Sequence, residues 1–177
     1  MLLLCLPGLV AAQEPAAVTR SKVEAAFLRN FARYVTWPPR SFANERTPWS
    51  VCILGHDPFE GELEATFQGR MEHGRPFEVF RANSLDRLPA CHIVFVGYQD
   101  VARRRAVLDE LKLLPTLTVG HAPEFLQEGG IIRLAVGERV EMSVNLDRAR
   151  AASLLIPAKM LEVSREVVEN GAVKRWK

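Results

Sequence analysis

Few side chains in this sequence are spaced for catalysis or metal binding. No two histidines lie three or four residues apart, the spacing of a helical metal pair; they are His56, His73, His92 and His121. His92 directly follows Cys91, and an imidazole beside a thiol can lower the thiol pKa. No Cys-x-x-Cys motif accompanies this pair. The missing motif weighs against a thiol oxidoreductase at Cys91 and His92, which is kept as one hypothesis. No metal site is expected.

A turn after the first apolar run is the other place that could bind a ligand. His56 and Asp57 follow residues 50–54, and α/β proteins often bind ligands just after a strand. The sequence has no phosphate-binding glycine motif and no G-x-S-x-G elbow. A small-ligand site at His56 and Asp57 is one interpretation. The alternative is that Asp57 caps a helix that begins at Pro58 and His56 is solvated. No catalytic residue or cofactor is predicted.

Cys52 and Cys91 lie in two apolar runs rich in β-branched residues, at positions 51–54 and 91–96. Neighbouring parallel strands lie about 4.8 Å apart, a spacing that can fit a disulfide. Closing a loop of this length would stabilise the fold by roughly 4 kcal/mol in the chain-entropy model, less any strain. Two buried free thiols are the alternative.

The first twelve residues are uncharged and almost wholly apolar. They are too few to span a bilayer, which takes about 20 residues, and Pro7 and Gly8 interrupt them. Val10-Ala11-Ala12 before Gln13 suits signal peptidase, so residues 1–12 are interpreted as a signal peptide. The missing basic n-region leaves open a true start upstream. The alternative is a ragged apolar N-terminus of a cytosolic protein.

The segment after this leader predicts an amphipathic helix from Ser21 to Trp37. Ser21 and Glu24 have the spacing of a capping box, and Trp37-Pro38-Pro39 would end the helix. One apolar stripe recurs at three and four residues: Val23, Phe27, Phe31 and Tyr34. We expect this stripe to cover a sheet.

The rest of the chain alternates strand and helix signals. Strands are predicted at residues 50–54, 77–80, 93–96 and 117–119, followed by a hairpin at 131–134 and 140–146. Helices are predicted at residues 59–67, 101–113, 124–126, 147–152 and 158–169. Unbroken apolar runs in the early strands favour a mostly parallel sheet with helices on both faces. The basic run Arg103-Arg104-Arg105 is interpreted as a solvated helix face.

Composition fits a single α/β domain. The chain has 177 residues, 48% of them hydrophobic and 25% charged, which is enough to bury a core. Its net charge of +2 creates no long-range field for nucleic acid or an anionic membrane. Without Cys5 of the leader, two cysteines remain, an even number that suits an oxidising compartment.

Residues 23–38, which read VEAAFLRNFARYVTWP, resemble the opening helix of the YfiR family of periplasmic proteins. Further similar pieces follow in the family's order: CILGHDPF at 52–59, CHIVFV at 91–96, and shorter ones at 117–119, 125–132, 144–149 and 159–161. The resemblance covers roughly residues 20–168.

This resemblance implies a non-enzymatic function. YfiR-like proteins inhibit an inner-membrane diguanylate cyclase, YfiN, and an outer-membrane lipoprotein, YfiB, sequesters them and so releases cyclic-di-GMP synthesis and biofilm formation. They are α/β proteins that tend to form dimers and depend on a disulfide. Cys52 and Cys91 stand where the family has its pair. A second disulfide of some members, around residues 125–133, has no cysteines here.

An inhibitor that acts by occupying a partner needs exposed apolar surface, usually with aromatic and Arg anchors. The predicted first helix offers candidates in Phe31, Tyr34 and Trp37, with Arg29 and Arg33 on its flank. Because most of the stripe must cover the sheet, only one or two of them can be contacts. A periplasmic small-ligand sensor that uses His56 and Asp57 or the strand ends is the alternative function.

We expect the mature protein to begin near Gln13 and to be found in the periplasm, because the small residues at 10–12 suit signal peptidase. N-terminal sequencing of protein from the periplasmic fraction measures this. An intact Met1 on protein from the cytosol would contradict it.

Overall fold

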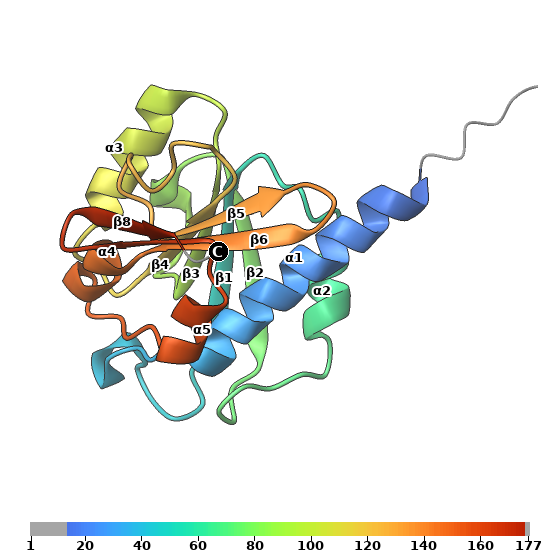
Figure 1. The fold of residues 1–177 in the computed structure, drawn as a ribbon. Helices are drawn as coiled ribbons and strands as arrows, with labels where there is room; N and C mark the ends of the chain where they lie inside the picture. Colours follow the sequence, from blue (N-terminus) through green and yellow to red (C-terminus); the bar gives the residue numbers. More distant parts are fainter. Residues whose placement is uncertain (1–13, 176–177) are drawn as a thin grey trace, which may run out of the picture.

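The computed structural model describes residues 14–175, so the predicted signal peptide at residues 1–12 lies outside the described residues. Eight strands form one sheet (Figure 1): β1 Trp49–Gly55, β2 Phe77–Ala82, β3 Ile93–Gly97, β4 Leu117–Gly120, β5 Ile132–Val136, β6 Val140–Asn145, β7 Glu166–Glu169 and β8 Ala172–Arg175. Five α-helices accompany it: α1 Glu14–Tyr34, α2 Glu62–Phe67, α3 Val101–Leu111, α4 Leu146–Ala151 and α5 Ala158–Glu162. Two 3-10 helices lie at Pro39–Ser41 and Leu85–Arg87.

The strand order is β2-β1-β3-β4-β5-β6-β7-β8. Strands β2 to β5 pair in parallel, β5 and β6 form an antiparallel hairpin, and β7 runs parallel to β6. The predicted α/β class, mostly parallel sheet and antiparallel hairpin are confirmed. Chain order reverses at β1, as in doubly wound folds, which often bind ligands at the carboxyl ends of the strands beside that point.

Two apolar cores lie on opposite faces of the sheet. On one face α1, α2 and α5 pack over side chains such as Ile53 and Phe95. On the other, α3 covers Leu54 and Val94 with the residues Val107, Leu108 and Leu111. The central strands therefore have no solvent-facing side, which explains their unbroken apolar sequence.

Helix α1 differs from its prediction in two ways. It already runs from Glu14, so Ser21 and Glu24 lie inside the helix and form no N-terminal capping box. Its buried stripe also differs from the predicted one and consists of Ala25, Leu28, Phe31, Ala32 and Val35. Val23 and Tyr34 of the predicted stripe are exposed. Small alanines at 25 and 32 let the helix approach the sheet closely, which decides which stripe is buried.

The end of the chain corrects a second prediction. The helix expected at 158–169 stops at Glu162, and residues Glu166–Glu169 form β7 instead. Asn170 and Gly171 both have positive φ angles and join β7 to β8 in a tight hairpin, as Asn-Gly pairs favour. The short helix expected at 124–126 is a series of turns.

Arg104 also departs from its interpretation as part of a solvated run. Its guanidinium forms a two-pronged ion pair with Glu128 at 2.7 and 2.8 Å, and the two side chains are only 6% and 1% exposed. Arg104 also donates to the carbonyl oxygens of Tyr98 and Gln99. The ion pair therefore fastens α3 to the segment between β4 and β5, and the two carbonyl contacts fasten it to the loop after β3.

We expect Glu128→Gln to lower the free energy of unfolding by about 3–5 kcal/mol at pH 7, because it leaves the buried Arg104 without its ion-pair partner. The hydrogen bonds from Arg104 hold the pKa of Glu128 below its ordinary value. The carboxylate therefore stabilises the fold above its unfolded pKa of about 4.3, and this contribution is lost as the pH falls through the folded pKa. The difference between wild type and variant should shrink in acid.

Denaturant unfolding at neutral pH and at about pH 3.5, below the ordinary Glu pKa, measures both effects. Glu110→Gln, at an exposed position of α3, is the matched control and should have little effect. Equal losses in the two variants would contradict a special contribution from the buried pair.

Candidate functional site

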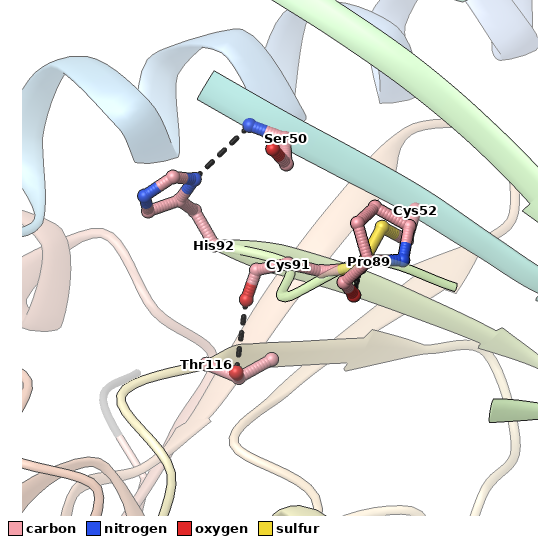
Figure 2. Close-up of a disulfide and its surroundings, with 6 residues drawn as sticks. All are labelled: Ser50, Cys52, Pro89, Cys91, His92 and Thr116. Carbon is pink, nitrogen blue, oxygen red and sulfur yellow. Dashed lines mark hydrogen bonds between the residues drawn. A yellow bond between two sulfur atoms is a disulfide. The ribbon is translucent and has the colours of Figure 1, made fainter. Parts of the chain in front are cut away.

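A disulfide joins Cys52 of β1 to Cys91, which lies two residues before β3. The Cα atoms are 6.1 Å apart, within the usual range. Strands β1 and β3 are parallel neighbours, as the pairing of the two apolar runs predicts. The bond lies in the core under α3. Figure 2 shows the bond and the residues around it.

His92 and Thr116 hold the chain on either side of this bond (Figure 2). The Ser50 amide donates to Nδ1 of His92 at 3.0 Å, so Nδ1 carries no proton and Nε2 donates to the Ser41 carbonyl. Burial lowers the pKa of His92, in agreement with this neutral form. The Thr116 hydroxyl donates to the Cys91 carbonyl at 2.9 Å. The segment before β3 is thereby tied to both neighbouring strands.

Cys91 and His92 point to opposite faces of the sheet, as alternate positions of an extended chain do. His92 stacks on Phe42 and packs against Trp49, whereas Cys91 lies in the core under α3. They do not form the thiol–imidazole pair on which the oxidoreductase hypothesis depended. Within residues 14–175, no cluster of three or more His, Cys, Asp and Glu side chains could hold a metal ion.

The predicted ligand residues His56 and Asp57 lie at the carboxyl end of β1, beside the reversal of strand order. Asp57 is occupied by internal contacts: its carboxylate accepts from the Phe59 amide at 2.7 Å and from Arg81 at 2.6 Å. Arg81 also pairs with Glu64 and keeps the pKa of that carboxyl below its ordinary value. His56 is exposed. The solvated His56 matches the alternative interpretation, but Asp57 holds a turn and caps no helix, because α2 begins only at Glu62.

The strand ends beside His56 are packed against their neighbours. A Cβ atom at Gly97 would lie only 2.0 Å from the His56 carbonyl oxygen, so this backbone approach requires glycine. At Gly120, a Cβ atom would meet the ring of Phe125 at 2.5 Å. Loop backbone and an aromatic ring thus fill space that a ligand would use in other doubly wound proteins.

The five predicted partner-binding residues divide into three groups. Phe31 and Trp37 are 1% and 6% exposed and belong to the core. Arg29 and Arg33 both pair with the buried carboxylate of Glu72, at 2.8 and 3.0 Å. These two pairs hold α1 to the segment between α2 and β2. Only Tyr34 presents its ring at the surface.

Tyr34 belongs to a cleft between α1, β6 and α5 with a volume of about 230 Å³. Lys159 of α5 lies over the Tyr34 ring, with its Nζ 3.7 Å from the ring centre. The other lining residues are mainly apolar: Phe27, Asn30, Phe31, Met142, Met160 and Val163. The sequence of α1 contained a signal for this cleft. The helix has apolar residues on two faces, and only one of these faces can pack on the sheet.

A family model described as YfiR/HmsC-like matches residues 21–165, which is most of the chain. The chain belongs to the YfiR/HmsC-like family. This assigns it to periplasmic regulators of cyclic-di-GMP signalling, a regulatory rather than catalytic family that interacts with YfiN-like partners. No curated protein matches the sequence. In the part of the chain that the structure describes, no helix combines the length and apolar character needed to cross a bilayer.

We expect Cys52→Ser to lower the free energy of unfolding by about 2–5 kcal/mol, because the variant loses the constraint on its unfolded chain. Denaturant unfolding in oxidising buffer measures the loss. Cys91→Ser and the double variant should lose about as much, since all three lack the same bond. An unchanged unfolding curve for Cys52→Ser would contradict a stabilising disulfide.

Proposed function

We propose that this protein is a periplasmic repressor that binds an inner-membrane diguanylate cyclase similar to YfiN. Binding lowers cyclic-di-GMP and biofilm formation. Membership of the YfiR/HmsC-like family over residues 21–165 is the observation that carries the proposal. The disulfide between Cys52 and Cys91 supports it, because such bonds persist in oxidising compartments like the periplasm.

Repression of this kind acts by occupying a partner and needs no reaction on this chain. Tyr34, Val163 and Leu155 are large apolar side chains at the surface, and a partner can bury them. The ligand-sensor alternative gains no support from His56 and Asp57, since Asp57 is held by Arg81 and the Phe59 amide.

A repressor must also be released. In this proposal an outer-membrane lipoprotein similar to YfiB sequesters the protein and frees the cyclase. The protein also acts as a homodimer in this proposal. Both assignments follow from the family.

Deleting the gene should raise cellular cyclic-di-GMP, and deleting the cognate membrane cyclase as well should abolish the rise. Mass-spectrometric quantification of cyclic-di-GMP in the parent, single-deletion and double-deletion strains measures this. Restoring the gene from a plasmid is the control and should return the level to that of the parent. Flat cyclic-di-GMP in the single deletion under several growth conditions would contradict the repressor function.

A further inference from the structure

Helix α1 carries a second apolar stripe that faces away from the sheet. Val23 is 40% exposed and Tyr34 is 36% exposed, with the partly buried Phe27 and the exposed Asn30 between them. These positions recur after four, three and four residues and so share one side of the helix over about 16 Å. Folding leaves this side without a covering element.

Phe27, Asn30 and Tyr34 of the stripe line one wall of the cleft, and residues of α5 line the other. Figure 1 shows α5 beside α1. Met142 of β6 and Met160 of α5 lie within it and are 4% and 6% exposed. Val163, just after α5, is 74% exposed at the rim. The cleft continues into a larger depression of about 630 Å³ through the shared residues Phe27, Met142 and Val163. Methionine-rich apolar floors can adapt to a partner's side chains.

Cations without acidic partners border this surface. Among the residues that the structure describes, Arg20, Lys22 and Lys159 are exposed and none forms an ion pair. Arg20 and Lys22 lie toward the start of α1, whereas Lys159 lies over Tyr34 near its end. Two carboxylates line the adjoining depression: Glu162, which is exposed, and Glu141, which pairs with Arg139 and Arg165. Positive charge therefore brackets the apolar stripe.

We infer that this cleft is the docking groove for an amphipathic helix of the partner protein, with apolar residues at helical spacing and acidic residues on its flanks. The inference rests on the proposed function and names its contact surface. A straight apolar ridge beside a groove suits helix-on-helix packing. Acidic flanks would pair with Lys22 at one end and Lys159 at the other.

The charges and the shape of the surface disfavour two other occupants. A second copy packed antiparallel on α1 would bring Arg20 and Lys22 close to Arg33 and Lys159 of its neighbour, and like charges repel. A bilayer surface is nearly flat and would leave the floor at Met142 and Met160 unfilled. The net charge of +2 also gives little attraction to anionic lipid.

The test is complementation of the deletion strain with full-length variants, with cyclic-di-GMP as the readout. Val163→Asp places a charge on the apolar rim, and Lys159→Glu reverses a flanking cation. We expect each variant to need about ten times the wild-type protein concentration for the same repression. A loss of this size is typical of one good interface contact. Both positions are exposed, so immunoblots and melting curves should match wild type.

Leu113→Asp is the matched control, because Leu113 is an apolar residue that is 68% exposed just after α3, on the other face of the sheet. It should repress like wild type. If Val163→Asp and Lys159→Glu also repress like wild type, the groove is not the docking site, although the repressor function stands. If the wild-type protein itself does not lower cyclic-di-GMP, the result contradicts the proposed repressor function.

Two further measurements identify the occupant. A photo-crosslinking amino acid at position 163 should link to an acidic, helical segment of the cognate cyclase, mapped by mass spectrometry. Crosslinks confined to a second copy would overturn the inference, and sedimentation would then show Val163→Asp as a weaker dimer. Vesicles of three parts phosphatidylcholine and one part phosphatidylglycerol test a membrane surface. If the wild type binds them and Val163→Asp does not, the inference of a protein partner is overturned.

Discussion

The central strands of the sheet are buried on both faces, and this constraint governs the rest of the structure. In β3 no side chain is more than 2% exposed, so each face needs a closely packed helix. The longest covering helix on each face is fastened by arginine on a buried carboxylate: α1 through Arg29 and Arg33 on Glu72, and α3 through Arg104 on Glu128. A buried carboxylate that loses its partner is costly, so these contacts fix where each helix lies.

The two ends of the central strands are closed by different means. At the amino ends, the disulfide and the contacts of His92 join the chain before β3 to β1. At the carboxyl ends, Gly97 lies so close to the His56 carbonyl oxygen that a residue with a Cβ atom would not fit. The site where many doubly wound folds bind a ligand is therefore filled by protein.

The sequence predicts strands β1 to β6 and the disulfide, because apolar runs and alternating patterns identify these strands, but it does not predict β7 or β8. Apolar β-branched runs identify β1 and β3, and their adjacency brings Cys52 to Cys91. The predictions fail where a tertiary contact decides between two local options. Ser21 and Glu24 match a capping box, yet the helix continues through them. Residues 166–169 could extend a helix, but pairing with β6 draws them into the sheet.

The candidate surface was predicted less well, because exposure depends on how a helix is rotated. Phe31 and Tyr34 lie three residues apart and look equivalent in sequence, yet one is buried and the other exposed. Arg104 lies between two exposed arginines and differs only because Glu128 faces it. No pattern within α3 contains that information, since the partner comes from a segment 24 residues later.

In the proposed function helix α1 serves both folding and recognition, because Val23 and Tyr34 lie outside its buried face while Phe27 and Phe31 join the core to the cleft. Ala25, Leu28 and Ala32 hold it against the sheet, and their loss would open a cavity in the core. Val23 and Tyr34 contribute little to that core, so they can vary with a partner while the fold is kept. A helix with a single apolar face would lack this freedom, because any contact residue would also be a core residue.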